Sequence, residues 1–258
     1  MPLPKATRTV LVTGGGRGIG AATAWLAAQQ GWAVAVNYAV GSAAALGMVA
    51  RIRAAGGCAF AVQADVAEAP QVQAMFEALD HELSTGHLPP LAALVNNAGV
   101  VDFPARVDEM SAARLQRMFA INVFGSFFCA RETVLRLSTR HGGAGGVIVN
   151  LSSAAARLGS PGQYVDYAAA KGAIDTFTIG LAKEVADEGI RVNAVRPGLI
   201  ETEIHASGGL PDRAQQLSHQ VPMQRTGSAE EVAQAIVWLC SDAASYTTGS
   251  LLDVTGGR

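Results

Sequence analysis

The sequence predicts a single α/β domain in which helices cover both faces of a parallel sheet. Short runs rich in β-branched residues alternate with longer Ala-rich stretches along the chain, and this alternation is typical of βαβ units. Half of the 258 residues are hydrophobic and no linker divides the chain, so we expect one large core. Right-handed crossovers then give a Rossmann-like, doubly wound sheet.

The predicted elements follow one another in a regular order. Strands are predicted for residues 9–12, 33–37, 59–63, 91–95, 147–151, 191–195 and 251–254. Helices are predicted for residues 21–30, 43–55, 71–83, 111–140, 165–187 and 229–239. Ligands of such sheets bind beyond the carboxyl ends of the strands, so the residues after each strand are the candidates for a site.

Composition argues against several classes of protein. The formal net charge is −2 with both signs spread along the chain, so we expect no nucleic-acid partner and no membrane-binding surface. Three scattered cysteines and five scattered histidines have no ligand spacing, so we expect no metal site and reduced thiols. The chain begins without a signal-like segment and contains no apolar run that looks long enough to span a bilayer, which predicts a cytoplasmic protein.

The first predicted strand runs into a glycine-rich turn. Gly14, Gly18 and Gly20 follow the spacing G-x-x-x-G-x-G, and a helix comes next. Glycines let the main chain approach a diphosphate, and the N–H groups of a helix start attract it. The spacing is neither the common G-x-G-x-x-G nor a P-loop. We interpret it as a dinucleotide-binding turn, with a purely structural strand-to-helix turn as the alternative.

The end of the second strand favours NADP(H). An acidic residue there would bind the ribose 2′-hydroxyl of NAD, but the chain has Val36-Asn37-Tyr38-Ala39. Arg17, in the glycine turn, has a planar guanidinium that suits a 2′-phosphate. If Arg17 is instead a solvated surface charge, NAD(H) remains the alternative.

Two other strand ends carry polar residues. Asp65 follows the third strand, where its carboxylate either accepts a hydrogen bond from an adenine amino group or caps a helix. Asn96-Asn97-Ala98-Gly99 follows the fourth strand, where asparagines are typical of turns.

Tyr167 and Lys171 stand four residues apart on a predicted helix and therefore share a face. A free tyrosine has a pKa of about 10, and a nearby ammonium lowers that pKa. Such a tyrosine can exchange a proton with a carbonyl or alcohol oxygen, although pairs of this kind also occur by chance.

Two further polar positions strengthen the catalytic interpretation. Ser152 and Ser153 end the fifth strand, where a hydroxyl can stabilise charge on a substrate oxygen or form a turn. Asn122 lies on an apolar helical stripe. A buried amide needs partners, so Asn122 marks either a structural polar site or a water relay.

Together these motifs resemble the short-chain dehydrogenase/reductase family, over nearly the whole chain from Thr9 to Gly257. The resemblance implies that Tyr167 is the general acid/base, that Lys171 tunes it and holds the nicotinamide ribose, and that Ser153 binds the substrate oxygen. Asn122 would hold a water behind Lys171. Ser153 stands one residue further from the tyrosine than is usual, so Ser152 is a rival. The implied cofactor residues are Gly14, Arg17, Gly18, Ile19, Gly20, Asn37, Asp65, Val66, Asn97, Gly99, Tyr167, Lys171, Pro197, Gly198, Ile200 and Thr202.

The resemblance leaves the substrate open. It implies hydride transfer between NADP(H) and a small carbonyl or alcohol, with residues 199–225 as the substrate-binding segment. The ending Asp253–Arg258 is similar to that of a subgroup labelled glucose-1-dehydrogenase-like or putative oxidoreductase. A 3-oxoacyl-thioester reductase and a sugar or polyol dehydrogenase are the two alternatives within enzymes. A dinucleotide-binding sensor or scaffold without catalysis is the alternative outside them. Pairing of the two long helices would give a homotetramer or homodimer.

Overall fold

Seven parallel strands form one sheet in the computed structural model, which describes residues 2–203, 208–210 and 212–258. The strand order is β3-β2-β1-β4-β5-β6-β7, with all neighbours parallel. The predicted fold class is therefore confirmed. The strands are β1 (Arg8–Val12), β2 (Trp32–Tyr38), β3 (Ala59–Gln63), β4 (Leu91–Asn96), β5 (Gly146–Leu151), β6 (Ile190–Pro197) and β7 (Leu251–Val254).

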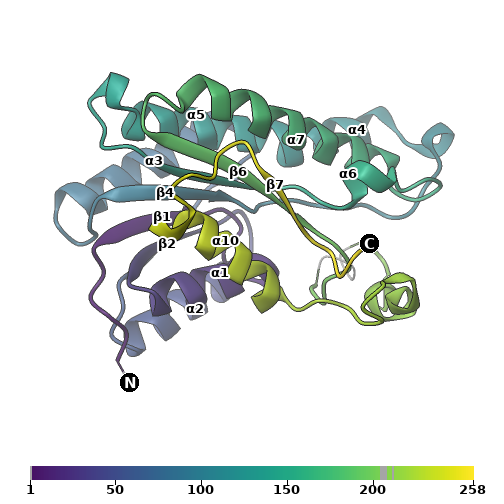
Figure 1. Cartoon of the computed structure of the whole chain (residues 1–258), viewed down its shortest axis with the longest axis horizontal. Helices are drawn as coiled ribbons and strands as arrows, with labels where there is room; N and C mark the ends of the chain where they lie inside the picture. The colour runs from purple at the N-terminus through teal and green to yellow at the C-terminus, as the bar shows by residue number, and fades with distance from the viewer. Residues whose placement is uncertain (1, 204–207, 211) are drawn as a thin grey trace.

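Helices cover both faces of the sheet, as Figure 1 shows. One face carries α1 (Gly18–Gln29), α2 (Ser42–Ala54) and α10 (Ala229–Cys240). The other carries α3 (Ala69–Ser84), α4 (Ala112–Phe119), α5 (Gly125–Leu137) and α7 (Val165–Val185). Short helices are α6 (Ala155–Leu158) and α9 (Arg213–Gln216), and single 3-10 turns lie at Val107–Glu109, Thr139–His141, Ser218–Gln220 and Asp242–Ala244.

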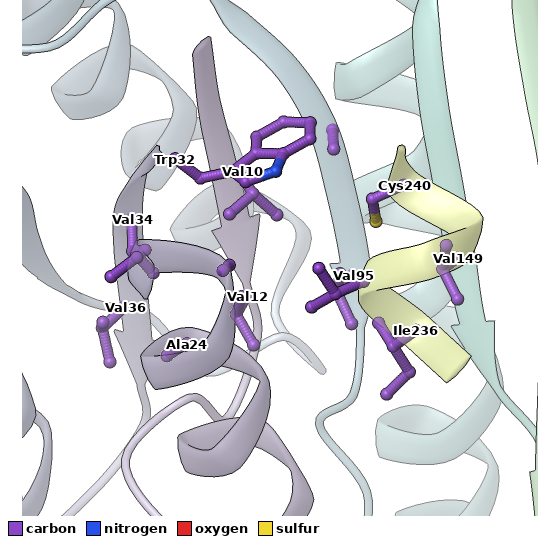
Figure 2. Close-up of a cluster of buried hydrophobic side chains, with 14 of the residues drawn as sticks. Val10, Val12, Ala24, Trp32, Val34, Val36, Val95, Val149, Ile236 and Cys240 are labelled. Atoms are coloured by element: carbon purple, nitrogen blue, oxygen red, sulfur yellow. The ribbon is translucent and has the colours of Figure 1, made fainter. Parts of the chain in front are cut away.

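Each face of the sheet packs its own apolar core. Strand residues alternate between the two sides, so Val10 and Val12 face α1 and α10 while Leu11 faces α3 and α5. Figure 2 shows the first core, where strand valines meet Ala24 and Ile236 from the helices. Both faces of each inner strand are buried, which explains the nearly continuous apolar runs in the sequence.

One predicted helix is interrupted. Residues 111–140 were expected to form one helical stretch, but a π-helical turn at Ala120–Phe124 separates α4 from α5. The turn contains Asn122, whose amide nitrogen donates to the main-chain oxygen of Met118 at 3.0 Å and to that of Val100 at the same distance. π-Turns of this kind are frequent at functional sites, and the amide leaves the helix to reach a neighbouring loop.

The same stretch also corrects an expectation about apolar runs. By length and composition alone, the 26 residues Ala112–Leu137, with a hydropathy of 1.2, could cross a membrane. Half of the most apolar window is buried inside the protein, where α5 packs against α3 and β4. The stretch therefore has the surroundings of a core helix in a globular domain.

Candidate active site

A cavity of about 1070 Å³ runs along the carboxyl ends of the strands. Residues that follow β1, β2, β3, β4, β5 and β6 line it, as expected for a ligand site in a doubly wound sheet. All site residues predicted from the sequence line the cavity except Gly20 and Asn122. The structure therefore brings together residues that are up to 188 positions apart, from Gly14 to Thr202.

The glycine-rich turn needs its glycines for two different reasons. Gly14 and Gly18 have φ angles of +61° and +52°, in a region of backbone conformation that residues with a Cβ atom rarely adopt. A Cβ at Gly20 would lie 2.4 Å from the main-chain oxygen of Gly14. No side chain caps the first turn of α1, so its N–H groups point to the cavity edge without a side-chain acceptor. These groups suit a phosphate.

Buried polar side chains hold this turn against the sheet. Asn37 is 1% exposed; its oxygen accepts from the main-chain nitrogen of Gly14 at 3.2 Å, and its nitrogen donates to the oxygen of Ala64 at 3.0 Å. The Asn97 amide donates to the main-chain oxygen of Thr13 at 2.8 Å. Asn37 and Asn97 thus fix the shape of the cavity wall.

The far end of the cavity, after β2 and β3, carries Arg17 and Asp65. Arg17 is exposed, and no hydrogen bond or ion pair joins its guanidinium to another described residue. One Asp65 oxygen accepts from the main-chain nitrogen of Ala67 at 2.9 Å, which is an Asx-turn contact. Val66 is buried beside Gly125. Asp65 therefore has a structural partner and still faces the cavity.

Tyr167 and Lys171 both lie on α7 and line the cavity. The Lys171 ammonium lies 5.6 Å from the centre of the Tyr167 ring and donates to the main-chain oxygen of Leu151 at 2.6 Å. Burial lowers the pKa of Lys171 to about 8, and the nearby Asp175 carboxylate opposes that shift. The cation is therefore held in place beside the tyrosine at the end of β5.

The two serines after β5 have different surroundings. The Ser152 hydroxyl is buried and donates to the main-chain oxygen of Lys171 at 3.2 Å. The Ser153 side chain is partly exposed, lines the cavity and accepts from the main-chain nitrogen of Ala155 at 3.1 Å. Ser153 is the serine with a hydroxyl proton still to donate.

Asn122, in the π-turn, binds the main chain of the cavity-lining residue Val100. Its oxygen accepts from the Val100 nitrogen at 3.1 Å, and its nitrogen donates to the Val100 oxygen at 3.0 Å. A Cβ at Gly99 would lie 2.8 Å from that Asn122 oxygen and 3.6 Å from the Lys171 nitrogen. Gly99 therefore lets the Asn122 oxygen approach the main chain more closely than a side chain would allow.

The segment after β6 forms the opposite wall. Pro197, Gly198, Ile200 and Thr202 line the cavity, and a Cβ on Gly18 would touch Thr202 at 3.4 Å. This segment therefore closes over the glycine turn. Within the predicted substrate-binding range 199–225, residues 204–207 and 211, among them His205 and Pro211, lie outside the described residues.

Two arginines were missed in the sequence, Arg114 next to the site and Arg258 in it. Arg114 donates to the Asp166 oxygens at 2.8 and 3.3 Å and to the Phe103 oxygen at 2.6 Å, which joins α4 to the first turn of α7. Arg258 lines the cavity from the residues after β7. No local sequence pattern predicts the Arg114–Asp166 pair, because its members are 52 residues apart. The sequence marks Arg258 only as part of the chain ending.

Comparison with known proteins agrees with the geometry. Residues 14–258 match a family model described as enoyl-(acyl carrier protein) reductase. The chain is 58% identical over 248 residues to the uncharacterized oxidoreductase YgfF of Escherichia coli K12, covering 96% of this chain and 98% of that protein. It is 36% identical to the 3-oxoacyl-(acyl-carrier-protein) reductase FabG of Staphylococcus aureus, with 98% of both chains covered.

A comparison with solved structures also finds oxidoreductases. The angucycline C-6 ketoreductase LanV, crystallised with bound NADP, matches with a TM-score of 0.88 and 31% identity, over 100% of this chain and 98% of that one. The chain belongs to the short-chain dehydrogenase/reductase family and is an oxidoreductase of that family. The alternative of a sensor or scaffold without catalysis is not favoured.

Proposed function

We propose that this protein transfers a hydride between NADP(H) and a small carbonyl or alcohol substrate, with Tyr167 as the general acid/base. The observation that carries the proposal is the joint placement of Tyr167, Lys171 and Ser153 on one cavity that begins at the glycine turn. Relatives crystallised with NADP or NADPH support the choice of cofactor.

The cavity fits a dinucleotide in three respects. Its glycine turn leaves main-chain N–H groups for a diphosphate. Arg17 is exposed at the rim with no ion-pair partner among the described residues, so its guanidinium is available for a 2′-phosphate. Asp65 offers a carboxylate oxygen to an adenine amino group. When bound, NADP(H) supplies or accepts the hydride.

The side chains around Tyr167 handle the proton. Tyr167 donates its phenolic proton to the substrate oxygen in the reductive direction and accepts one from an alcohol in the other. The Lys171 ammonium favours the phenolate form and holds the nicotinamide ribose. Ser153 donates a hydrogen bond to the substrate oxygen as negative charge develops on it. Asn122 and Lys171, whose polar atoms both lie near Gly99, hold a water that returns a proton to the tyrosine.

We further propose that the protein pairs through α5 and α7 into a homodimer or homotetramer in the cytoplasm. The exposed faces of these helices carry Phe127, Leu135 and Ile179, and Phe124 precedes α5 at the end of the π-turn; these side chains are 38–51% exposed. Apolar side chains in that number on neighbouring helices favour an interface.

The direct test compares two tyrosines of the same cavity. Tyr167→Phe should reduce NADPH oxidation, measured with a panel of aldehydes and ketones, by about 10²-fold or more, while NADPH still binds. Tyr164→Phe, which removes the hydroxyl of a second cavity tyrosine, should keep most of the turnover. Normal turnover by Tyr167→Phe would refute the proposed role.

A further inference from the structure

We infer that the substrate carries an anionic group, a carboxylate or a phosphate monoester, away from its reacting carbonyl, and that Arg258 binds it. The inference rests on the proposed function and adds a substrate class to it. Its basis is the position of Arg258, the way its main chain is held, and the distribution of charge along the cavity.

Arg258 lies at the opposite end of the cavity from the adenine site. The sheet order puts β3 and β2 at one edge and β7 at the other, with β5 between them. Tyr167 and Lys171 stand at the end of β5, where Lys171 contacts the Leu151 oxygen. Arg258 follows β7 and lines the same cavity. A substrate with its carbonyl at Tyr167 therefore extends toward Arg258.

The main chain around Arg258 is held by close contacts. Gly256 and Gly257 have φ angles of +65° and +96°, and a Cβ on Gly257 would lie 3.1 Å from the Pro222 ring. The Arg157 guanidinium donates to the main-chain oxygen of Arg258 at 3.2 Å. In Figure 1 the end of the chain lies beside the yellow-green segment that follows β6. Two glycines and a neighbouring arginine thus direct this side chain to the cavity.

Arg258 has no carboxylate partner among the described residues. Its guanidinium makes one long contact, 3.4 Å to the Gln220 side-chain oxygen. The neighbouring arginines differ, because Arg157 lies 3.3 Å from Asp253 and Arg225 lies 2.6 Å from Glu231. A guanidinium that is partly buried at a cavity wall and lacks an acid binds carboxylate or phosphate well, because its planar donors match two oxygens.

The acids of the cavity lie elsewhere. Among its described lining residues, the acidic side chains are those of Asp65 and Glu203. Asp65 follows β3, and a Glu203 oxygen would lie 3.5 Å from a Cβ on Gly18, so both belong to the cofactor end. The substrate end combines Arg258 with the neutral polar residues Ser160, Gln163 and Gln220. This arrangement favours an anion over a cation or a purely apolar tail.

Matched substrates test the inference. We would measure kcat/KM with NADPH for a 4-oxo carboxylate and its methyl ester, and for a hydroxyketone and its phosphate monoester. In one of the two pairs, the wild type should have a kcat/KM about tenfold or more higher for the anionic compound than for the neutral one. Hydrogen bonds between charged groups are strong enough to give a difference of that size. The pair that shows this difference tells whether the substrate carries a carboxylate or a phosphate.

Two variants locate the effect. Arg258→Gln should remove most of the preference by lowering kcat/KM of the anion, with the neutral partner and the Kd of NADPH unchanged. Arg225→Gln, which removes an arginine already paired with Glu231, should keep the preference. Equal kcat/KM for charged and neutral partners in the wild type, or a preference that survives Arg258→Gln, would overturn the inference.

A binding measurement separates this inference from the proposed function. Calorimetric titration of the NADPH complex with an alkanoate and an alkyl phosphate needs no turnover. Binding of one anion that weakens about tenfold in Arg258→Gln supports the anion site, even if no carbonyl is reduced, and equal binding by both proteins refutes it. Reduction of neutral ketones without any such binding would support the proposed function alone.

Discussion

The two ends of the cavity are built in different ways. At the end formed by β1, β2 and β4, amide side chains bind the main chain of neighbouring strands, as Asn37 binds Gly14 and Ala64. At the end formed by β6 and β7, the walls are segments far apart in the chain, such as Arg258 against Gln220. The first end is fixed by the sheet and suits a cofactor of constant shape. The second depends on loop contacts, which is where relatives differ in substrate.

The largest effect is expected at the Arg114–Asp166 pair, which joins α4 to the first turn of α7 next to Tyr167. The Asp166 side chain is fully buried and that of Arg114 is 11% exposed. Arg114→Met leaves the carboxylate buried and unpaired, which should lower the free energy of unfolding by about 3–5 kcal/mol. Urea denaturation measures the loss.

Arg106→Met is the control, because the Arg106–Asp108 pair has side chains that are 74% and 65% exposed. Its change should stay below about 1 kcal/mol. Losses of similar size in both variants would show that the buried Arg114–Asp166 pair stabilises the fold no more than an exposed pair does.

The next effect tests the cofactor end. A Cβ at Gly20 would lie 2.4 Å from the Gly14 oxygen and 2.5 Å from the Asn97 amide nitrogen, so Gly20→Ala must displace the glycine turn. NADPH affinity, measured by fluorescence titration, should fall by about 10²-fold, as expected when two hydrogen bonds to the charged diphosphate, of about 1.5 kcal/mol each, are lost. Gly47→Ala, in α2 with nothing within 4 Å of the new Cβ, should leave affinity unchanged. Unaltered binding by Gly20→Ala would contradict the close packing.

A smaller effect separates the two forms of the cofactor. Arg17→Ala should weaken NADPH binding by about tenfold or more, because it removes hydrogen bonds between charged groups. NADH lacks the 2′-phosphate and should bind as before, which makes it the internal control. Competition titrations with both cofactors measure the two losses, and equal losses would remove Arg17 from 2′-phosphate recognition.

The smallest effect concerns Lys171 and pH. Burial lowers its pKa in the folded apo protein to about 8, whereas the unfolded chain keeps a value near 10.4. Between these values the unfolded state binds more protons, so Lys171 makes stability rise with pH, by at most about 1.4 kcal/mol per pH unit.

Denaturation of the apo protein at pH 7.5, 8.5 and 9.5 tests whether Lys171 makes stability rise with pH. The same measurement on Lys171→Met provides the reference. The difference in unfolding free energy between wild type and variant should move in favour of the wild type as the pH rises. A difference that stays constant, or that moves the other way, would contradict a depressed lysine pKa.

The fold and the cofactor end followed from the sequence for the same physical reason. Buried parallel strands show as apolar runs, and each predicted strand was found to within two residues at each end. The residues directly after those strands meet at one edge of the sheet. Gly14, Arg17 and Asp65 could therefore be placed near one another without knowledge of any long-range contact.

What the sequence did not reveal depends on contacts across the chain. The π-turn at Ala120–Phe124 was missed because its cause, the two-way bond between Asn122 and Val100, joins residues 22 positions apart. Arg114 and Arg258 were missed for the same reason, since their partners come from other elements. The choice between Ser152 and Ser153 also needed the structure, because only the position of Lys171 shows which hydroxyl is engaged.

The central claim is that the cavity binds NADP(H) with its reacting end beside Tyr167. Titration calorimetry of the apo protein with NADPH and NADH, on wild type and Tyr167→Phe, tests it most directly. The account predicts that both proteins bind NADPH with similar Kd and more tightly than NADH, while the variant fails to oxidise it. Absence of binding for both cofactors would contradict the account, because every proposed role in the cavity depends on a bound dinucleotide.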